Sequence, residues 1–122
     1  MITFQWTWPH SDLLPNNSNG HHFGKRLNPK EAAKDEARLL ALPYRGTVAQ
    51  NRRLALSVTF YPPDLRHRDL DNLIAALKPY IDGMAEGLNV NDKKIKRIVA
   101  EQVEGKFHAG AVVVELSYAE AL

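Results

Sequence analysis

The chain has 122 residues, of which 44% are hydrophobic and 25% are charged, and its formal net charge is +2. This size and composition are typical of globular proteins, so residues 1–122 are expected to form a single domain. The absence of cysteine excludes disulfides, thiolate nucleophiles and cysteine-bound zinc or iron–sulfur sites. Because no apolar run of about 18 residues and no signal peptide is visible, we expect a cytoplasmic protein with no membrane partner.

The first half of the chain predicts a strand, a long loop and a helix. Residues 2–8 alternate and are rich in β-branched and aromatic side chains, which indicates a strand. Residues 9–29 are rich in Asn, Gly, Pro and His, and a loop of about 20 residues in so small a domain is usually functional or mobile. Residues 30–42 are strong helix formers that follow the start signal Asn28-Pro29.

The second half predicts a strand, the principal helix and two further strands. Residues 52–62 alternate most clearly. Apolar residues keep helical spacing over 70–86, and Gly87 fits the position just past a helix end. Residues 95–105 and 110–118 predict two antiparallel strands joined by a turn. This order favours an α+β domain with two main helices packed on one side of a small mixed sheet of about four strands.

Two aspartates stand at the expected start of the 70–86 helix. Residues two apart on a helix point about 200° away from each other, so Asp69 and Asp71 share a face only where an extended segment turns into helix. N-capping by itself explains Asp69. Arg66 and Arg68 fit either surface ion pairs or a phosphate-binding patch. Three interpretations follow: capping with ordinary surface charges, phosphate binding, or carboxylates that hold a metal ion.

Asp92 lies beyond the helix, and distance tests whether it can join the pair. A straight helix over 70–87 is about 25 Å long, whereas the connection back to Asp92 spans at most about 17 Å, which leaves roughly 8 Å between backbones. Two Asp side chains bound to one ion only just bridge that gap. Pro79 favours a bend, because proline removes a helical donor and clashes with the carbonyl four residues earlier. With a straight helix, Asp92 belongs to a partner chain's site or to none.

Two segments of the sequence resemble segments of a known family. RHRDLDNL, followed by a helix and then NVNDKKI, resembles the RusA family of Holliday junction resolvases over roughly residues 66–98, and LLPNNSNGHHFGKR resembles that family's Pro-Asn loop. The resemblance implies a RusA-like fold and a homodimeric, magnesium-dependent endonuclease that cuts opposing strands of a four-way DNA junction in recombination and repair. It implies that Mn²⁺ can replace Mg²⁺ and that no nucleotide cofactor is needed.

The resemblance also implies roles for individual residues. Asp69, Asp71 and Asp92 would be the catalytic metal ligands, which suits Mg²⁺ because this ion prefers carboxylate oxygens. DNA-binding residues are expected among the basic and polar side chains of both segments: Asn16, His21, His22, Lys25, Arg26, Arg66, Arg68, Lys93, Lys94 and Lys96. Dimer symmetry would supply two sites for two cuts.

Two positions depart from the family's pattern. Members often carry a catalytic Lys four residues after the second Asp, where this chain has Ala75. Lys78 either replaces that cation as a catalytic residue or pairs with Asp82 at i+4. Asn91 stands where some members have Asp, and its amide oxygen can still bind a metal ion while it carries less charge.

Two other functions stay open. Ala75 is compatible with a non-catalytic module that binds junctions and uses its acids structurally. A nuclease for flaps, replication forks or other branched DNA would share the chemistry and differ only in substrate. The adjacent His21 and His22 suit a DNA-facing loop better than a metal site, because neighbouring imidazoles point apart.

Overall fold

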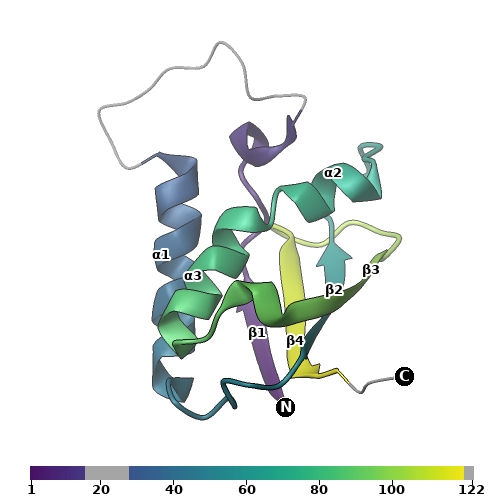
Figure 1. Cartoon of the computed structure of the whole chain (residues 1–122). Helices are drawn as coiled ribbons and strands as arrows, with labels where there is room; N and C mark the ends of the chain where they lie inside the picture. The colour runs from purple at the N-terminus through teal and green to yellow at the C-terminus, as the bar shows by residue number, and fades with distance from the viewer. Residues whose placement is uncertain (16–27, 120–122) are drawn as a thin grey trace.

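A computed structural model describes residues 1–15 and 28–119 of the chain. Figure 1 shows its strands and helices. In chain order they are β1 (Ile2–Trp6), η1 (Ser11–Leu13), α1 (Pro29–Ala41), η3 (Leu42–Tyr44), β2 (Leu54–Tyr61), α2 (Leu70–Ala75), α3 (Lys78–Leu88), η4 (Asp92–Lys94), β3 (Ile95–Gln102) and β4 (Ala111–Tyr118). The predicted strands and helices are therefore present, with ends that differ by a few residues.

The strands form one four-stranded sheet in the order β1-β4-β2-β3. β4 runs antiparallel to both β1 and β2, whereas β3 runs parallel to β2. A parallel neighbour needs a crossover connection, which α2 and α3 supply between β2 and β3. The predicted α+β fold, with a small mixed sheet and two main helices, is confirmed.

The predicted direct pairing of residues 95–105 with residues 110–118 is wrong. β3 and β4 run in opposite directions, but β2 lies between them and pairs with both. The segment that joins them passes the end of β2, where the Val103 N–H donates to the Phe60 carbonyl at 2.9 Å. The glycines between β3 and β4 suggested a hairpin. The strand that separates β3 from β4 is β2, which comes from a distant part of the sequence.

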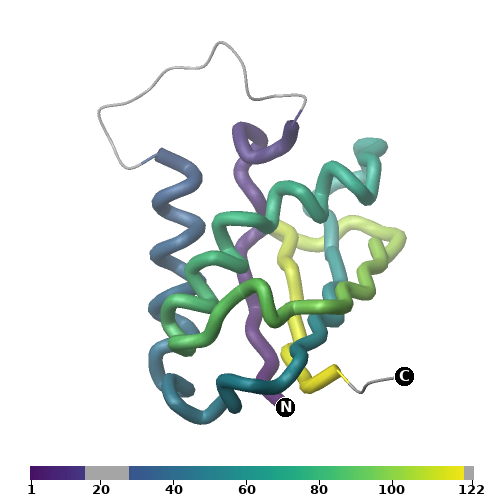
Figure 2. The backbone as a smooth tube through the Cα atoms, viewed as in Figure 1, coloured from purple at the N-terminus to yellow at the C-terminus, as the bar shows by residue number. Residues whose placement is uncertain are grey.

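Helices cover one face of the sheet, and the core lies between these two layers (Figure 2). Alternate strand residues point into this core, namely Ile2, Phe4, Trp6, Leu54, Leu56, Val58, Phe60, Val112, Val114 and Leu116. Trp6 stacks on Tyr80 with ring centroids 5.2 Å apart, which ties β1 to α3. The other face carries polar residues such as Gln5, Ser57 and Glu115, all exposed. None of the described helices has the length and hydrophobicity that a membrane-spanning segment requires.

The principal helix is split in two. The apolar periodicity over 70–86 predicted one helix bent near Pro79, whereas α2 ends at Ala75 and α3 begins at Lys78. Pro79 lies in the first turn of α3, where its missing N–H needs no partner. The break thus falls just before the proline, and Leu77 between the two helices is fully buried.

Gly87 does not end this helix as predicted. α3 continues to Leu88, and Asn89 takes the left-handed conformation (φ 61°) that terminates it. Gly83 and Gly87 instead face α1, the helix that lies beside α3 in Figure 1. A Cβ at Gly83 would overlap the backbone carbonyl of Lys34. These glycines therefore let α3 pack closely against α1, whose buried residues are all alanines.

Replacing Gly83 by Ala is expected to destabilise the protein. Alanine favours a helix over glycine by about 1 kcal/mol, but the added methyl would push α1 and α3 apart, and overpacking costs about 1–3 kcal/mol or more. Because the clash is with backbone atoms, the cost should exceed the gain, and the free energy of unfolding should fall by about 1–2 kcal/mol, measured by urea denaturation. Glu86→Ala, on the exposed side of α3, is the control and loses only a surface ion pair with Lys34. An unchanged Gly83→Ala midpoint would show that the contact is not tight.

Candidate functional site

The chain reaches α2 through a turn that Asp64 and Arg68 hold together. Arg68 Nη2 donates to Asp64 Oδ1 at 2.8 Å, and Arg68 Nη1 donates to the Arg66 carbonyl at 3.1 Å. The Arg68 guanidinium also lies 5.1 Å from the centroid of the Trp8 ring, and its side chain is only 12% exposed. Arg68 is therefore mainly committed to this turn, although it was predicted as a DNA-binding residue.

A structural role for Asp64 was not predicted from the sequence, although Pro62-Pro63-Asp64 is a turn signal. Its carboxylate accepts the Arg66 N–H at 2.9 Å. This hydrogen bond and the Arg68 guanidinium hold the pKa of Asp64 below its ordinary value, so the turn stays ion-paired at neutral pH. Among the described residues, Arg66 and Arg68 both pair with Asp64, and neither pairs with Asp69 or Asp71.

Asp69 occupies the N-cap position of α2, but its side chain does not cap the helix. Its backbone is extended (φ −84°, ψ 132°), and its carboxylate accepts no hydrogen bond from the first turn. The side chain is 66% exposed, and Oδ1 lies 3.9 Å from Nε2 of His67. The predicted change from extended chain to helix at this point is confirmed. The Asp69 carboxylate, however, makes no capping hydrogen bond.

Asp71 is exposed in the first turn of α2. No other described residue forms a hydrogen bond or ion pair with it. An acid in a first turn gains only about 0.3–1 kcal/mol from the helix dipole. The start of α2 therefore presents two carboxylates that contribute little to the fold.

A cleft of about 390 Å³ opens beside the start of α2. Its walls include Trp8, Ser11, Arg66, His67, Asp69 and Asn72. The side chains of Arg66 and His67 are 78% and 95% exposed, so both can reach a ligand in solvent. This cleft combines the exposed carboxylate of Asp69 with the cationic side chain of Arg66, as a site for a metal-bound phosphate requires.

Lys78 holds Asp92 on the side of α3. Lys78 Nζ donates to Asp82 Oδ1 at 2.9 Å and to Asp92 Oδ2 at 3.3 Å. The predicted i,i+4 pair with Asp82 is therefore present. This carboxylate, and after it that of Asp92, raises the pKa of Lys78. Ala75, where a Lys was expected, lies with Lys78 along a second cleft of about 480 Å³.

Asp92 and the Asp69–Asp71 pair lie toward opposite ends of β3. Asp92 begins η4, directly before β3, whereas Arg66 and His67 share a small cleft with Gln102 and the residues that follow β3. Eight residues of strand separate these ends by about 25 Å. Within the described residues, no group of three or more His, Asp or Glu side chains is placed to bind one ion. The three aspartates are thus not assembled within one chain.

The remaining predicted site residues fall into two groups. Lys93, Lys94 and Lys96 lie in η4 and β3, and none of them forms an ion pair with another described residue. The side chain of Asn91, which departs from the family's pattern, caps η4 by accepting the Lys93 N–H at 2.9 Å. The other predicted DNA-binding residues, Asn16, His21, His22, Lys25 and Arg26, lie outside the described residues.

Comparison with known proteins identifies a relative of this chain. It is an uncharacterized protein of Xylella fastidiosa, 32% identical over 121 residues that cover 90% of this chain and 72% of that protein. The chain belongs to the family of that Xylella protein. No protein-family model matches the chain. The name of the Xylella relative states no activity, so function in this family has to be argued from the site.

Proposed function

We propose that this protein is a Mg²⁺-dependent endonuclease for branched DNA and, within that class, a Holliday junction resolvase of the RusA type. It would act as a homodimer in the cytoplasm of a bacterium or of a phage-infected bacterial host. The observation that carries the proposal is the pair of exposed carboxylates, Asp69 and Asp71, which neither cap α2 nor pair with an arginine, beside a cleft that also holds Arg66.

The residues at the start of α2 fit a magnesium ion. Mg²⁺ is usually held by one or two carboxylates together with water and substrate phosphate oxygens. Asp69 makes no capping hydrogen bond and Asp71 no hydrogen bond or ion pair with a described residue, so both can bind a cation without breaking the fold. Bound there, the ion would activate a water molecule and stabilise negative charge on the scissile phosphodiester.

The chain's own cations would hold the DNA backbone. Arg66 is exposed at the cleft and can contact a phosphate directly, whereas Arg68 fixes the turn that presents it. Lys93, Lys94 and Lys96 form a second basic group at the start of β3, and phosphate contacts of this kind supply most of the affinity for DNA.

Asp92 is proposed to act in the site of a partner chain. Within its own chain it pairs with Lys78, and it lies at the other end of β3 from the exposed carboxylates. In a two-fold dimer, each site could combine the α2 start of one protomer with the η4 segment of the other. Two such composite sites would match two cuts on a junction.

A non-catalytic junction-binding module is the second candidate. It is favoured by Ala75 at the position of the expected lysine and by the engagement of Lys78 in two ion pairs. On this reading, Asp82 and Asp92 would be structural, and binding would need no divalent ion. Nucleases for flaps or forks differ from the first proposal only in substrate.

One assay separates these functions. The wild-type protein is incubated with a synthetic four-way junction, a flap, a fork and a linear duplex, each with Mg²⁺, Mn²⁺ or EDTA. We expect paired nicks in the junction with either metal ion, at least about tenfold faster than in the other substrates, and no cleavage in EDTA. Junction binding without cleavage under every divalent ion would support the binding module, and faster cutting of flaps or forks would support the broader nuclease.

A further inference from the structure

β3 is an edge strand with apolar side chains in solvent. It is at the end of the sheet order, and no described strand pairs with its outer side. Ile98 and Val99, in its middle, are 43% and 58% exposed. Edge strands normally carry charged residues that prevent pairing with other chains, whereas here charges stand only toward the two ends: Lys96 and Arg97 at one and Glu101 at the other.

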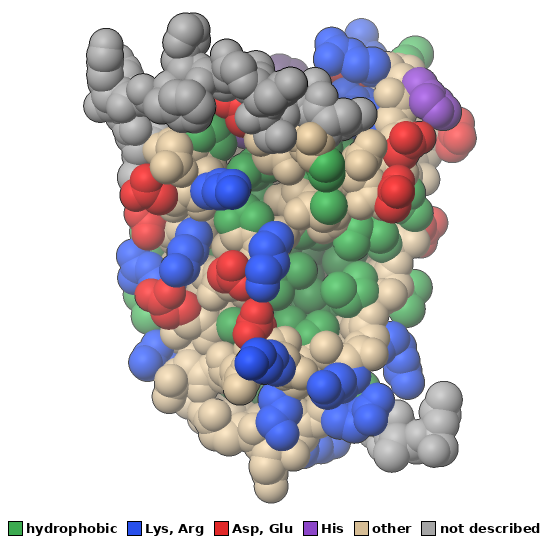
Figure 3. All heavy atoms as spheres, turned by 45° about the horizontal axis from the view of Figure 1, so that its top comes forward, with side chains coloured by type: hydrophobic (Ala, Val, Ile, Leu, Met, Phe, Trp, Pro, Cys, Tyr) green, Lys and Arg blue, Asp and Glu red, His purple; other side chains and the backbone are tan. Residues whose placement is uncertain are grey.

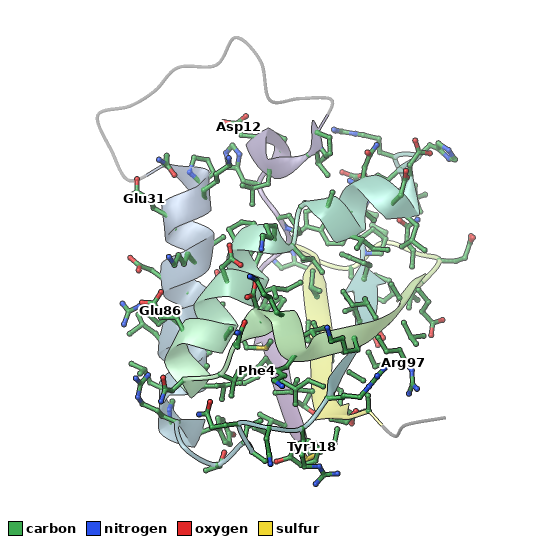
Figure 4. The ribbon with its side chains drawn as sticks, viewed as in Figure 1. Phe4, Asp12, Glu31, Glu86, Arg97 and Tyr118 are labelled. Carbon is green, nitrogen blue, oxygen red and sulfur yellow. The ribbon has the colours of Figure 1, made fainter. Side chains whose placement is uncertain are left out.

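The register with β2 assigns these side chains to the two faces of the sheet. Arg97, Val99 and Glu101 align with Ala55, Ser57 and Thr59, so they share the open face. Ile98 and Ala100 align with core residues of β2 and therefore share the helix face. Figure 4 shows Arg97 pointing out from β3 into solvent.

The helix face beside this edge is also apolar. Leu70 and Ile74 of α2 and Ile95 of β3 are only partly buried, and α2 packs near β3. Figure 3 shows hydrophobic side chains gathered at the centre right of the view, where α2 and β3 adjoin. The strand and the helix beside it thus leave a continuous apolar margin.

We propose that two copies of this chain associate by antiparallel pairing of their β3 edges, with the two-fold axis at Val99. In a continuous antiparallel sheet, residues directly opposite each other point to the same face. With the axis at Val99, Arg97 of each copy lies opposite Glu101 of the other, Val99 meets Val99, and Ile98 meets Ala100. Opposite charges and apolar pairs directly across an antiparallel ladder are stabilising.

Charge selects this register and this orientation. Moving the axis to Ile98 sets Arg97 opposite Val99, and moving it to Ala100 sets Glu101 opposite Val99, so either shift loses the ion pairs. Parallel pairing in register would bring Arg97 beside Arg97 and Glu101 beside Glu101, which is repulsive. The arrangement is closed, because each copy uses its β3 edge once.

This surface would build the homodimer of the proposed nuclease, and in that respect the inference rests on the proposed function. Association is measured without DNA, whereas cleavage is measured with it. A failure of the β3 pairing and a failure of nuclease activity are therefore distinguishable.

Sedimentation of the full chain over a wide concentration range tests the pairing. The wild type should be a dimer, and Val99→Lys should raise the dissociation constant at least about 100-fold, because two ammonium groups would face each other at the axis. Leu39→Lys, at an equally exposed apolar position on α1 (57%), is the matched control and should leave the dimer intact. A monomeric wild type, or a Val99→Lys protein that still dimerises normally, would overturn the proposal.

Charge reversal tests the register itself. Arg97→Glu and Glu101→Arg should each weaken self-association, since each creates like charges across the ladder. The double variant R97E/E101R, and a mixture of the two single variants, should recover dimers because opposite charges face each other again. Weak single variants with no recovery in either combination would rule out this register.

Discussion

Asp71→Asn is expected to abolish cleavage of a four-way junction while the protein remains folded. The carboxylate is exposed and has no described partner, so its replacement by the isosteric amide should cost the fold no more than about 1 kcal/mol of dipole interaction. Loss of a metal-binding carboxylate removes several kcal/mol of transition-state stabilisation, which corresponds to at least about a 100-fold slower reaction. The nicking rate is measured under single-turnover conditions with Mg²⁺.

Three controls make the Asp71→Asn result specific. Glu115→Gln, on the exposed open face of the sheet, removes the same charge away from α2 and should cut at the wild-type rate. Asp71→Asn should still bind the junction in a gel-shift assay and unfold within a few degrees of the wild type. If this folded variant cuts as fast as the wild type, Asp71 is no metal ligand and the proposed active site is wrong.

A heterodimer of an Asp71→Asn chain with an Asp92→Asn chain is expected to regain activity that neither homodimer has. If each site combines Asp69 and Asp71 of one protomer with Asp92 of the other, both lesions fall in one site and the second site is intact. The heterodimer, purified through two different tags, should nick at roughly half the wild-type rate, because it has one intact site of two. It should cut one strand and fail to make the paired cut that resolves a junction.

The control for this complementation is a heterodimer of Asp69→Asn with Asp71→Asn. These lesions lie on the same side of a composite site, so each of its two sites would carry one lesion and no activity should return. Recovery in this control would point to a different division of the residues. An inactive Asp71→Asn with Asp92→Asn heterodimer that still binds the junction would contradict sharing of Asp92, whereas full activity of the Asp92→Asn homodimer would remove Asp92 from the chemistry.

Local sequence was sufficient for most of the secondary structure. Alternation identified β1 and β2, and strong helix formers after Asn28-Pro29 identified α1. The Asn28 side chain caps the N-terminus of α1 by accepting the Glu31 N–H at 2.9 Å. These features depend on neighbours a few residues away, so the sequence contains them directly. The helix start at Asp69 was predictable for the same reason.

Strand pairing was not predictable from such patterns. Residues 95–102 and 111–118 each have the composition of a strand, and the glycines between them suggested a hairpin. The structure places β2 between them, because the crossover through α2 and α3 returns the chain to the far edge of the sheet. That edge position, which no local pattern reveals, leaves the outer side of β3 without a described partner strand.

Local patterns in the sequence were enough to predict the α+β class, the change from extended chain to helix at Asp69, and the acidic and basic residues around that point. The pairing of Lys78 with Asp82 was also predicted, because these residues are four apart on a helix. The contact of Lys78 with Asp92, 14 residues along the chain, and the pairing of Arg68 with Asp64 and not with Asp69 or Asp71 are visible only in the folded structure. Charge partners depend on where the chain returns in space, whereas helix and strand formation depends mainly on adjacent residues. The residues proposed for catalysis could therefore be named from sequence, but their division between the two ends of β3 could not.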